Sequence, residues 1–227
     1  MITHGIILYI IGALEIILAF YVLLRNSKSE VCRAYFAFAF GVIIWVLANG
    51  SVALFHDSVH LLLLYKLTYF GGAITAGSFL YFTWVFPYKV SYINTIKKVI
   101  VVIPGILLGA LLFWTDSVVS GFKFLSWGIQ VSFGNLYILY VIIFLIYFPW
   151  AFIHLYKKYR RSNGMHYWQL KYLLISTSIP FVVSLVTDIF VPWLVHEPGS
   201  WTVFLGSETT IIWLGLTAYI LFKKEVR

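Results

Sequence analysis

Residues 136–155 read LYILYVIIFLIYFPWAFIHL, and this apolar run governs how the whole chain must fold. A second apolar run covers residues 172–194. Each run is close to the roughly 20 apolar residues that a helix needs to cross a hydrocarbon core about 30 Å thick. The two runs are therefore predicted to cross a membrane in opposite directions.

Between these runs lies a basic segment, which is expected to be a loop. Its five cations are Lys157, Lys158, Arg160, Arg161 and Lys171. Short loops rich in Lys and Arg stay in the cytoplasm. The segment therefore fixes the orientation of both neighbouring spans, with residue 136 entering from outside and residue 194 returning there.

The composition agrees with a membrane protein. Hydrophobic residues make up 62% of the chain and charged residues 11%, whereas soluble domains are about half apolar and a quarter charged. A net charge of +8 in a soluble protein would suggest nucleic acid as a partner, but here the cations lie in short loops between apolar runs. The lipid bilayer is the expected partner, and no nucleic acid is expected.

Seven apolar spans are predicted, so the fold class is an all-α membrane protein, a single seven-transmembrane helix bundle over residues 1–227. The spans are residues 6–24, 34–55, 61–86, 99–114, 136–155, 172–194 and 202–222. Fourteen of the sixteen Lys and Arg residues fall on one side of this arrangement. This bias predicts an outside N-terminus and a cytoplasmic C-terminus in a bacterial inner membrane.

The one long connection, residues 115–135, is expected outside, between the fourth and fifth spans. It contains three glycines and alternating apolar residues around Lys123 and Gln130. That alternation predicts a short β-hairpin that covers the ends of the helices.

Four ionisable residues fall inside spans: Glu15, Lys66, Asp188 and Glu208. A charge at the bilayer centre costs about 2.5–3.5 kcal/mol on insertion scales, so each group needs a partner, water or a change of protonation. At 1.5 Å per residue, all but Glu15 lie roughly 8–9 Å below the outer surface, and Ser184 is one turn from Asp188. One hypothesis is an outward-facing polar pocket that binds a ligand, and the alternative is a structural network of ion pairs.

Histidines offer only weak metal candidates, namely His56, His60 and His196, and no metal site or other cofactor is expected. Cys32 is the only cysteine, which excludes an internal disulfide. No HExxH helix, glycine-rich phosphate loop or nucleophile elbow is present, so no enzyme is expected.

Several motifs resemble the N-terminal seven-transmembrane sensor region of bacterial histidine kinases. The matching segments, in order, are IIWVLA (43–48), FLYFTWVFP (79–87), WTD (114–116), GNLY (134–137), QLKYLL (169–174) and Pro180. The resemblance implies reception of a stimulus at or within the membrane. In that family the last helix continues into an output module, whereas this sequence stops after the seventh span, so kinase activity is not implied.

These observations favour a receptor module that detects a ligand or membrane state through its outer half and signals to a separate cytoplasmic partner. The five cations of the basic segment are the expected docking surface, the small ligand is unknown, and a homodimer is an open possibility. The alternative is a small transporter or carrier that uses the intramembrane acidic residues, although no inverted repeat is visible. A structural or assembly factor is a third reading.

Overall fold

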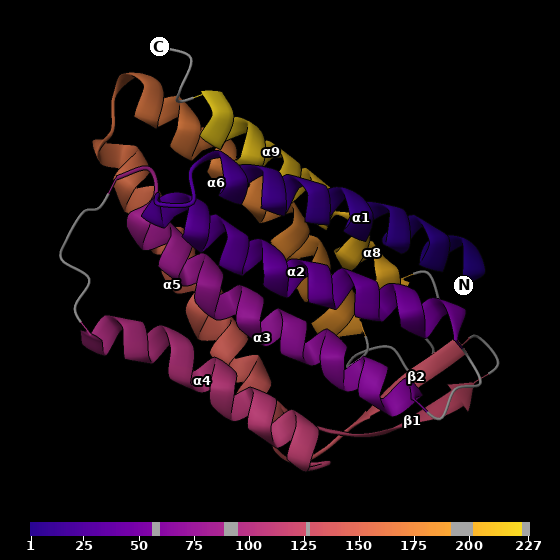
Figure 1. Cartoon of the computed structure of the whole chain (residues 1–227). Coiled ribbons are helices and arrows are strands. Elements are labelled where there is room, and N and C mark those ends of the chain that lie inside the picture. Colours follow the sequence, from indigo (N-terminus) through magenta and orange to yellow (C-terminus); the bar gives the residue numbers. More distant parts are fainter. Residues whose placement is uncertain (56–59, 89–94, 126–127, 192–201, 224–227) are drawn as a thin grey trace.

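The computed structural model describes residues 1–55, 60–88, 95–125, 128–191 and 202–223 of the 227-residue chain. Within these ranges the chain forms a bundle of long helices with one small sheet (Figure 1). The elements are α1 (Ile2–Arg25), α2 (Glu30–Leu54), α3 (Leu61–Val85), α4 (Thr95–Trp114), β1 (Val119–Leu125), β2 (Gly128–Phe133), α5 (Tyr137–Arg161), α6 (Gly164–Ser184), the π-helical segment η1 (Leu185–Phe190), α8 (Thr202–Glu208) and α9 (Thr210–Lys223). The prediction of an all-α bundle is confirmed.

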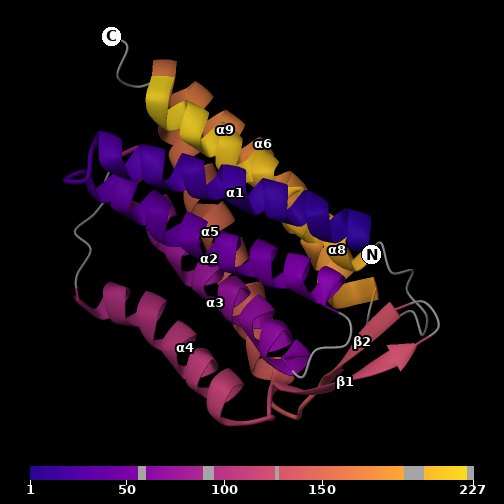
Figure 2. The same ribbon diagram turned by 45° about the vertical axis from the view of Figure 1, so that its right-hand side comes forward.

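The bundle has two distinct ends, visible in both views (Figures 1 and 2). The beginning of α1 and the β1–β2 sheet lie toward one end, which we call the hairpin end. The turn between α1 and α2, the turn between α5 and α6 and the end of α9 lie toward the other, which we call the tail end. The start of α1 and the end of α9 therefore lie at opposite ends of the bundle.

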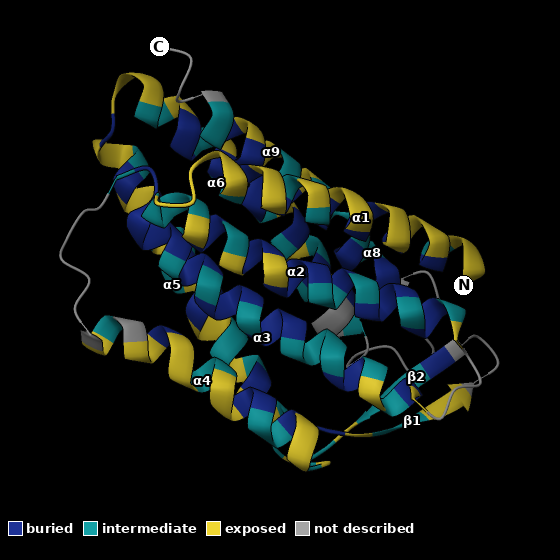
Figure 3. Ribbon diagram, in the orientation of Figure 1, coloured by how far each residue is buried: buried dark blue, intermediate teal, exposed yellow. Residues whose placement is uncertain are grey.

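Among the described residues, five stretches are long and apolar enough to cross a membrane: Ile2–Arg25, Glu30–Leu54, Tyr137–Arg161, Gly164–Thr187 and Phe204–Phe222. A shorter apolar stretch, Val99–Trp114, lies in α4. Exposed residues run along the outer faces of α1 and α4 (Figure 3), and on α1 they include Ile6, Ile10 and Ile17. Apolar side chains on an outer face avoid water when the bundle lies in lipid.

The expectation of a basic loop after residue 155 is wrong, because the helix continues to Arg161. Lys158, Arg160 and Arg161 fall in its last turn, where cations interact favourably with the partial negative charge of a helix C-terminus. Only residues 162 and 163 separate α5 from α6. Gly164 begins α6 with a φ of +59°, a conformation that glycine adopts without the steric cost that a side chain brings.

Two other predicted spans also differ in detail from the helices. The sixth begins at Gly164 rather than at residue 172, and it passes into the π-helical segment η1 after Ser184. The seventh is interrupted at Thr209, between α8 and α9. Hydropathy marks where a chain lies in lipid, and it carries little information on these local changes of helical pitch.

Helices α2 and α3 approach each other closely. A β-carbon on Gly71 would lie 2.6 Å from the backbone nitrogen of Trp45, and one on Gly41 would lie 2.7 Å from the backbone nitrogen of Thr75. Small residues let backbones meet in this way in membrane bundles. Helix α1 packs on α2 of this pair, and α4 and α5 pack on α3.

Aromatic rings fill the middle of the bundle. Trp213 of α9 lies 4.7 Å from Phe38 and 4.9 Å from Phe79, measured between ring centroids. Phe148 of α5 packs on Phe79 at 5.7 Å. These contacts hold α2, α3, α5 and α9 together around Trp213, which is 2% exposed.

The predicted hairpin is confirmed within residues 115–135. Strands β1 and β2 are antiparallel, with Phe122 opposite Val131 and Phe124 opposite Ile129. Backbone hydrogen bonds from Gly134 to Val118 and from Leu136 to Ser117 tie the hairpin to the start of α5. The sheet is therefore positioned over the helix ends on the side where α5 begins.

Candidate functional site

A cavity of about 160 Å³ lies inside the bundle beneath the hairpin. Its walls come from α2, α3, α5, α6 and α9, and strand β2 closes it with Ile129, Gln130, Val131 and Phe133. Thr187 of η1 also borders the cavity, so its walls come from elements that are far apart in the sequence. This is the arrangement in which small molecules are usually bound between helices of a bundle.

One face of α5 supplies an aromatic wall. Tyr137, Tyr140, Phe144 and Phe148 all line the cavity, and their spacing of three and four residues places them on the same side of the helix. Neighbouring rings along this face contact one another, with centroid separations of 6.0, 6.1 and 4.4 Å. The wall offers both flat faces and ring edges to whatever occupies the cavity.

The hairpin is attached to this wall through aromatic contacts. Phe133 at the end of β2 stacks on Tyr137 with ring centroids 3.8 Å apart. Tyr69 of α3 meets both rings edge-on, at 5.8 Å from Phe133 and 5.9 Å from Tyr137. A movement of the hairpin therefore changes the shape of the cavity directly.

Polar groups of the cavity come from hydroxyl and amide side chains. Asn49 of α2 is buried, donates a 2.5 Å hydrogen bond to Ser207 of α8 and accepts one of 3.2 Å from Thr68 of α3. It therefore joins three elements at the edge of the cavity. The indole nitrogen of Trp213 is buried and has no hydrogen-bond partner among the described residues.

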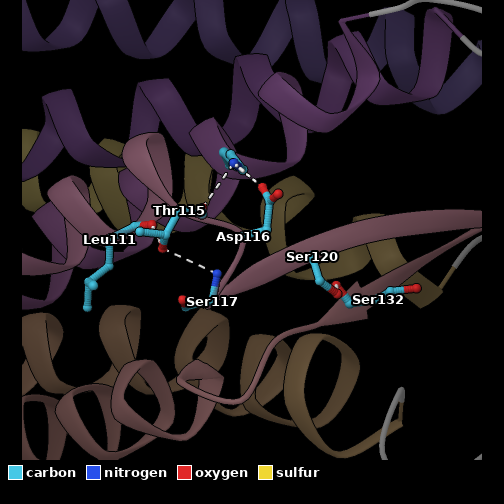
Figure 4. A network of polar contacts seen from close by, with 7 residues as sticks. Leu111, Thr115, Asp116, Ser117, Ser120 and Ser132 are labelled. Carbon is cyan, nitrogen blue, oxygen red and sulfur yellow. Dashed lines mark hydrogen bonds and ion pairs between the residues drawn. The ribbon is translucent and has the colours of Figure 1, made fainter.

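Lys66 binds the segment that follows α4. Its Nζ donates to the Asp116 carboxylate at 2.8 Å and to the Thr115 carbonyl oxygen at 3.1 Å. Thr115 and Asp116 follow the end of α4, at the point where the chain turns into the hairpin (Figure 4). Lys66 therefore fastens the base of the hairpin to α3.

Glu208 has a different partner. Its Oε1 lies 2.7 Å from Nδ1 of His4, in the first turn of α1, and His4 also stacks on Phe204. Glu208 and Lys66 therefore have different partners: Glu208 joins α8 to α1, and Lys66 joins α3 to the residues that follow α4. Their charges serve separate contacts at the hairpin end.

Glu15 is fully buried between α1 and α9. Its Oε1 accepts a 2.7 Å hydrogen bond from the hydroxyl of Thr210, and its Oε2 has no partner among the described residues. Of the other expected pocket residues, Ser184 lines the cavity. Asp188 belongs to η1, and its side chain lies outside the described part of the structure.

Four of the five cations expected to form a docking surface are at least partly exposed. Lys157, Arg160 and Arg161 are exposed. Lys171 is half-buried, and its Nζ lies 5.0 Å from the ring centroid of Trp168. Lys158 does not fit that expectation, since it is 4% exposed. Its Nζ donates to the carbonyl oxygens of Thr83, Trp84, Phe86 and Tyr88 at 2.6–3.1 Å.

Lys158 is buried because it continues an inward-facing stripe of α5. Ala151 and Leu155 precede it on the same face, and both are fully buried. If residues 151–158 are taken as a helix, residues 151, 155 and 158 lie on one face, and Lys157 lies outside that face. This spacing in the sequence distinguishes Lys158 from its exposed neighbour Lys157. Of the carbonyl groups that accept from Lys158, those of Thr83, Trp84 and Phe86 lie at the end of α3, where a helix leaves carbonyl groups without intrahelical partners.

The weak metal candidates do not form a site in the described part of the chain. His60 is exposed at the start of α3, while His56 and His196 lie outside the described residues. Within the residues that the structure describes, no group of three or more His, Cys, Asp or Glu side chains could hold a metal ion.

Sequence reasoning missed most of the residues that line the cavity. The sequence predicts residues 136–155 only as a membrane span. The only available signal was the recurrence of Tyr and Phe at positions 137, 140, 144 and 148. That pattern is equally typical of a packed helix, so it predicts burial rather than a cavity.

The comparison with known families agrees with the architecture. No curated protein matches the chain. Residues 7–223 match the family model described as the N-terminal 7TM region of histidine kinase, which confirms the expected family and a multi-pass location in the inner membrane. The match covers nearly the whole chain, and the protein therefore belongs to the family of N-terminal seven-transmembrane regions of histidine kinases.

Proposed function

We propose that this sensor module detects a small ligand in the cavity beneath the hairpin and passes the signal to a cytoplasmic signalling protein. The observation that carries the proposal is that one cavity is bordered by β2 and also by α6, η1 and α9. Helices α6 and α9 extend between the cavity and the tail end (Figure 1). A ligand that changes the packing of these helices at the cavity therefore also moves their residues at the tail end.

The transmitting element is proposed to be the α6–α9 pair. Pro180, Phe181 and Ser184 of α6 and Trp213 of α9 line the cavity, and Gln169 of α6 donates a 3.5 Å hydrogen bond to the Ile220 carbonyl near the tail end. π-Helical segments such as η1 often occur at functional sites. A ligand shifts the pair only if it binds one arrangement more tightly than the other.

The output surface is proposed to be the exposed basic face at the tail end, made by Lys157, Arg160, Arg161 and Lys171. Lys158 is left out because it is buried. Clustered cations recognise acidic groups on a partner and speed association. The family match points to a histidine kinase as the class of partner.

Crosslinking in the native host tests this proposal. The double variant Arg160→Glu/Arg161→Glu is expected to lose a crosslinked histidine kinase that the wild-type protein captures, because charge reversal repels an acidic partner. Lys28→Glu, an exposed cation in the α1–α2 turn at the same end, is the matched control and should keep the kinase. Equal capture by both variants contradicts the proposed output surface. Substrate flux through the purified protein in proteoliposomes would favour the transporter alternative instead.

A further inference from the structure

A groove of about 800 Å³ runs along the outer side of the bundle, between α3 and α4 and beside Ala37 of α2. Its lining residues on α4 extend from Val101 to Trp114, which is about 20 Å of helix at 1.5 Å per residue. The described linings of the groove and of the cavity beneath the hairpin share no residue. Val102, Ile106 and Trp114 are exposed, so the groove is open to the lipid that surrounds the bundle.

The groove is a gap between side chains, flanked by a close contact of the two helices. A β-carbon on Gly77 would lie 2.7 Å from the carbonyl oxygen of Val101, so α3 and α4 touch there. A β-carbon on Gly105 would meet only the carbonyl oxygen of Ala73, at 4.0 Å. The contact at Gly77 therefore holds the walls in place, and the space in front of Gly105 stays open.

The hydroxyl groups of the lining already have partners within the protein. The Ser78 hydroxyl donates to the Ile74 carbonyl oxygen at 2.5 Å, and the Tyr81 hydroxyl donates to Oε1 of Glu30 at 2.7 Å. The other described lining residues are glycine or have aliphatic or aromatic side chains. An apolar occupant suits this surface, because a polar group buried there without a partner would cost free energy.

Two cations flank the tail end of the groove. Arg33 lies one turn before the lining residue Ala37 on α2, and Lys97 lies one turn before the lining residue Val101 on α4. Residues four apart share a helix face, so each cation continues a wall of the groove toward the tail end (Figure 1). Arg33 is exposed and Lys97 is half-buried. Glu30 is a carboxylate at this end, so two cations stand against one anion.

This charge favours a lipid over a second copy of the chain as the occupant. The positive-inside effect gives every copy the same orientation, so a neighbouring copy would bring its own tail end to this position. Exposed cations at that end, such as Lys28, Arg160 and Arg161, would then meet Arg33 as like charges. An acidic phospholipid instead brings an anionic headgroup and an apolar chain, and basic pockets between helices on the cytoplasmic side suit such headgroups.

We propose that the groove binds an acidic phospholipid of the cytoplasmic leaflet, with an acyl chain between α3 and α4 and the phosphate held by Arg33 and Lys97. The site is independent of the proposed function, since it requires neither a ligand in the cavity nor the cations Arg160 and Arg161.

Three probes separate the contributions of the chain and of the charge. Native mass spectrometry of the purified full chain, released from detergent micelles, measures retention of phosphatidylglycerol, of phosphatidylcholine with the same acyl chains, and of glycerol 3-phosphate. Phosphatidylglycerol is expected to be retained about tenfold more than phosphatidylcholine, and glycerol 3-phosphate not at all. Equal retention of the two lipids overturns the proposal, and so does retention of glycerol 3-phosphate as strong as that of phosphatidylglycerol.

Gly105→Leu tests the groove itself, because the new side chain enters the open space and no charge changes. This variant is expected to lose the retained phosphatidylglycerol, whereas the matched control Gly105→Ala, which adds one carbon, keeps it. A loss in Gly105→Leu alone cannot come from general attraction between a basic protein and acidic lipid. Unchanged retention in Gly105→Leu overturns the assignment of the groove.

The double variant Arg33→Gln/Lys97→Gln tests the headgroup contacts. It is expected to retain the two phospholipids equally, whereas Lys28→Gln, which removes an exposed cation at the same end, keeps the preference. A preference that survives the double variant overturns the roles of Arg33 and Lys97, and this arm still decides if Gly105→Leu does not fold. A dimer that carries no lipid and is lost in Gly105→Leu would assign the groove to a second copy and overturn the proposal.

Discussion

Lys158 donates a hydrogen bond of 2.6 Å from Nζ to the carbonyl oxygen of Phe86, and so joins the tail-end turn of α5 to the end of α3. The same nitrogen reaches three further carbonyl groups in that segment. One buried cation therefore satisfies a helix end that lacks intrahelical partners. The contact holds together two helices that both line the cavity.

Replacing Lys158 by Met should lower the free energy of unfolding by about 2 kcal/mol, because hydrogen bonds to a charged donor are worth about 1.5–3 kcal/mol. Lys157→Met removes an exposed cation from the next position and should change stability little. Thermal unfolding of both variants in the same detergent measures the difference. Equal melting temperatures would show that the carbonyl cluster does not depend on Lys158.

Gly71→Ala should destabilise the bundle by about 1–3 kcal/mol, because the added carbon would lie within 2.8 Å of backbone atoms of Trp45 and Gly41. Gly105→Ala in α4 is the matched control, since the nearest atom there is 4.0 Å away. Alanine is also the better helix former, so the control should be neutral or stabilising. Denaturation of the two variants side by side checks this, and a stable Gly71→Ala protein would contradict the close α2–α3 crossing.

Thr210→Val should cost about 1–3 kcal/mol, because it removes the hydrogen bond that the buried carboxyl of Glu15 accepts across the α1–α9 contact. Thr209→Val is the control, since the Thr209 hydroxyl donates to the Gly206 carbonyl of its own segment and, among the described residues, to no group of another helix. Melting curves that fall equally for both threonines would mean that the contact with Glu15 contributes nothing to stability.

The hairpin end is predicted to face the outside and the tail end the cytoplasm. After Cys32→Ser removes the only cysteine, Ser120→Cys in β1 should react with an impermeant maleimide in intact spheroplasts. Lys157→Cys at the tail end should react only after the membrane is permeabilised. Both native residues are exposed, so the readout depends on the side of the membrane. The reverse labelling pattern would overturn the orientation and the proposed output surface with it.

Residues 115–135 are a segment whose structure can be predicted from its own sequence. Their alternation of apolar and polar side chains predicts a hairpin, and the strands form there because each residue pairs with one no more than 14 positions away. The basic segment after residue 155 shows the opposite case. Charge predicted a loop, but the helix continues because cations are favourable at its C-terminus and one of them has buried acceptors in α3.

The amino-acid sequence was sufficient for the helical bundle, the hairpin and the membrane setting, because these depend on the length and hydropathy of each segment taken alone. Tertiary structure decided which groups meet. Lys66 and Glu208 were placed at similar depth by counting residues, yet Lys66 pairs with Asp116 and Glu208 with His4. Counting along a helix gives depth in the bilayer, whereas partners depend on how the helices are rotated and packed around one another. The cavity arises from that same packing of side chains.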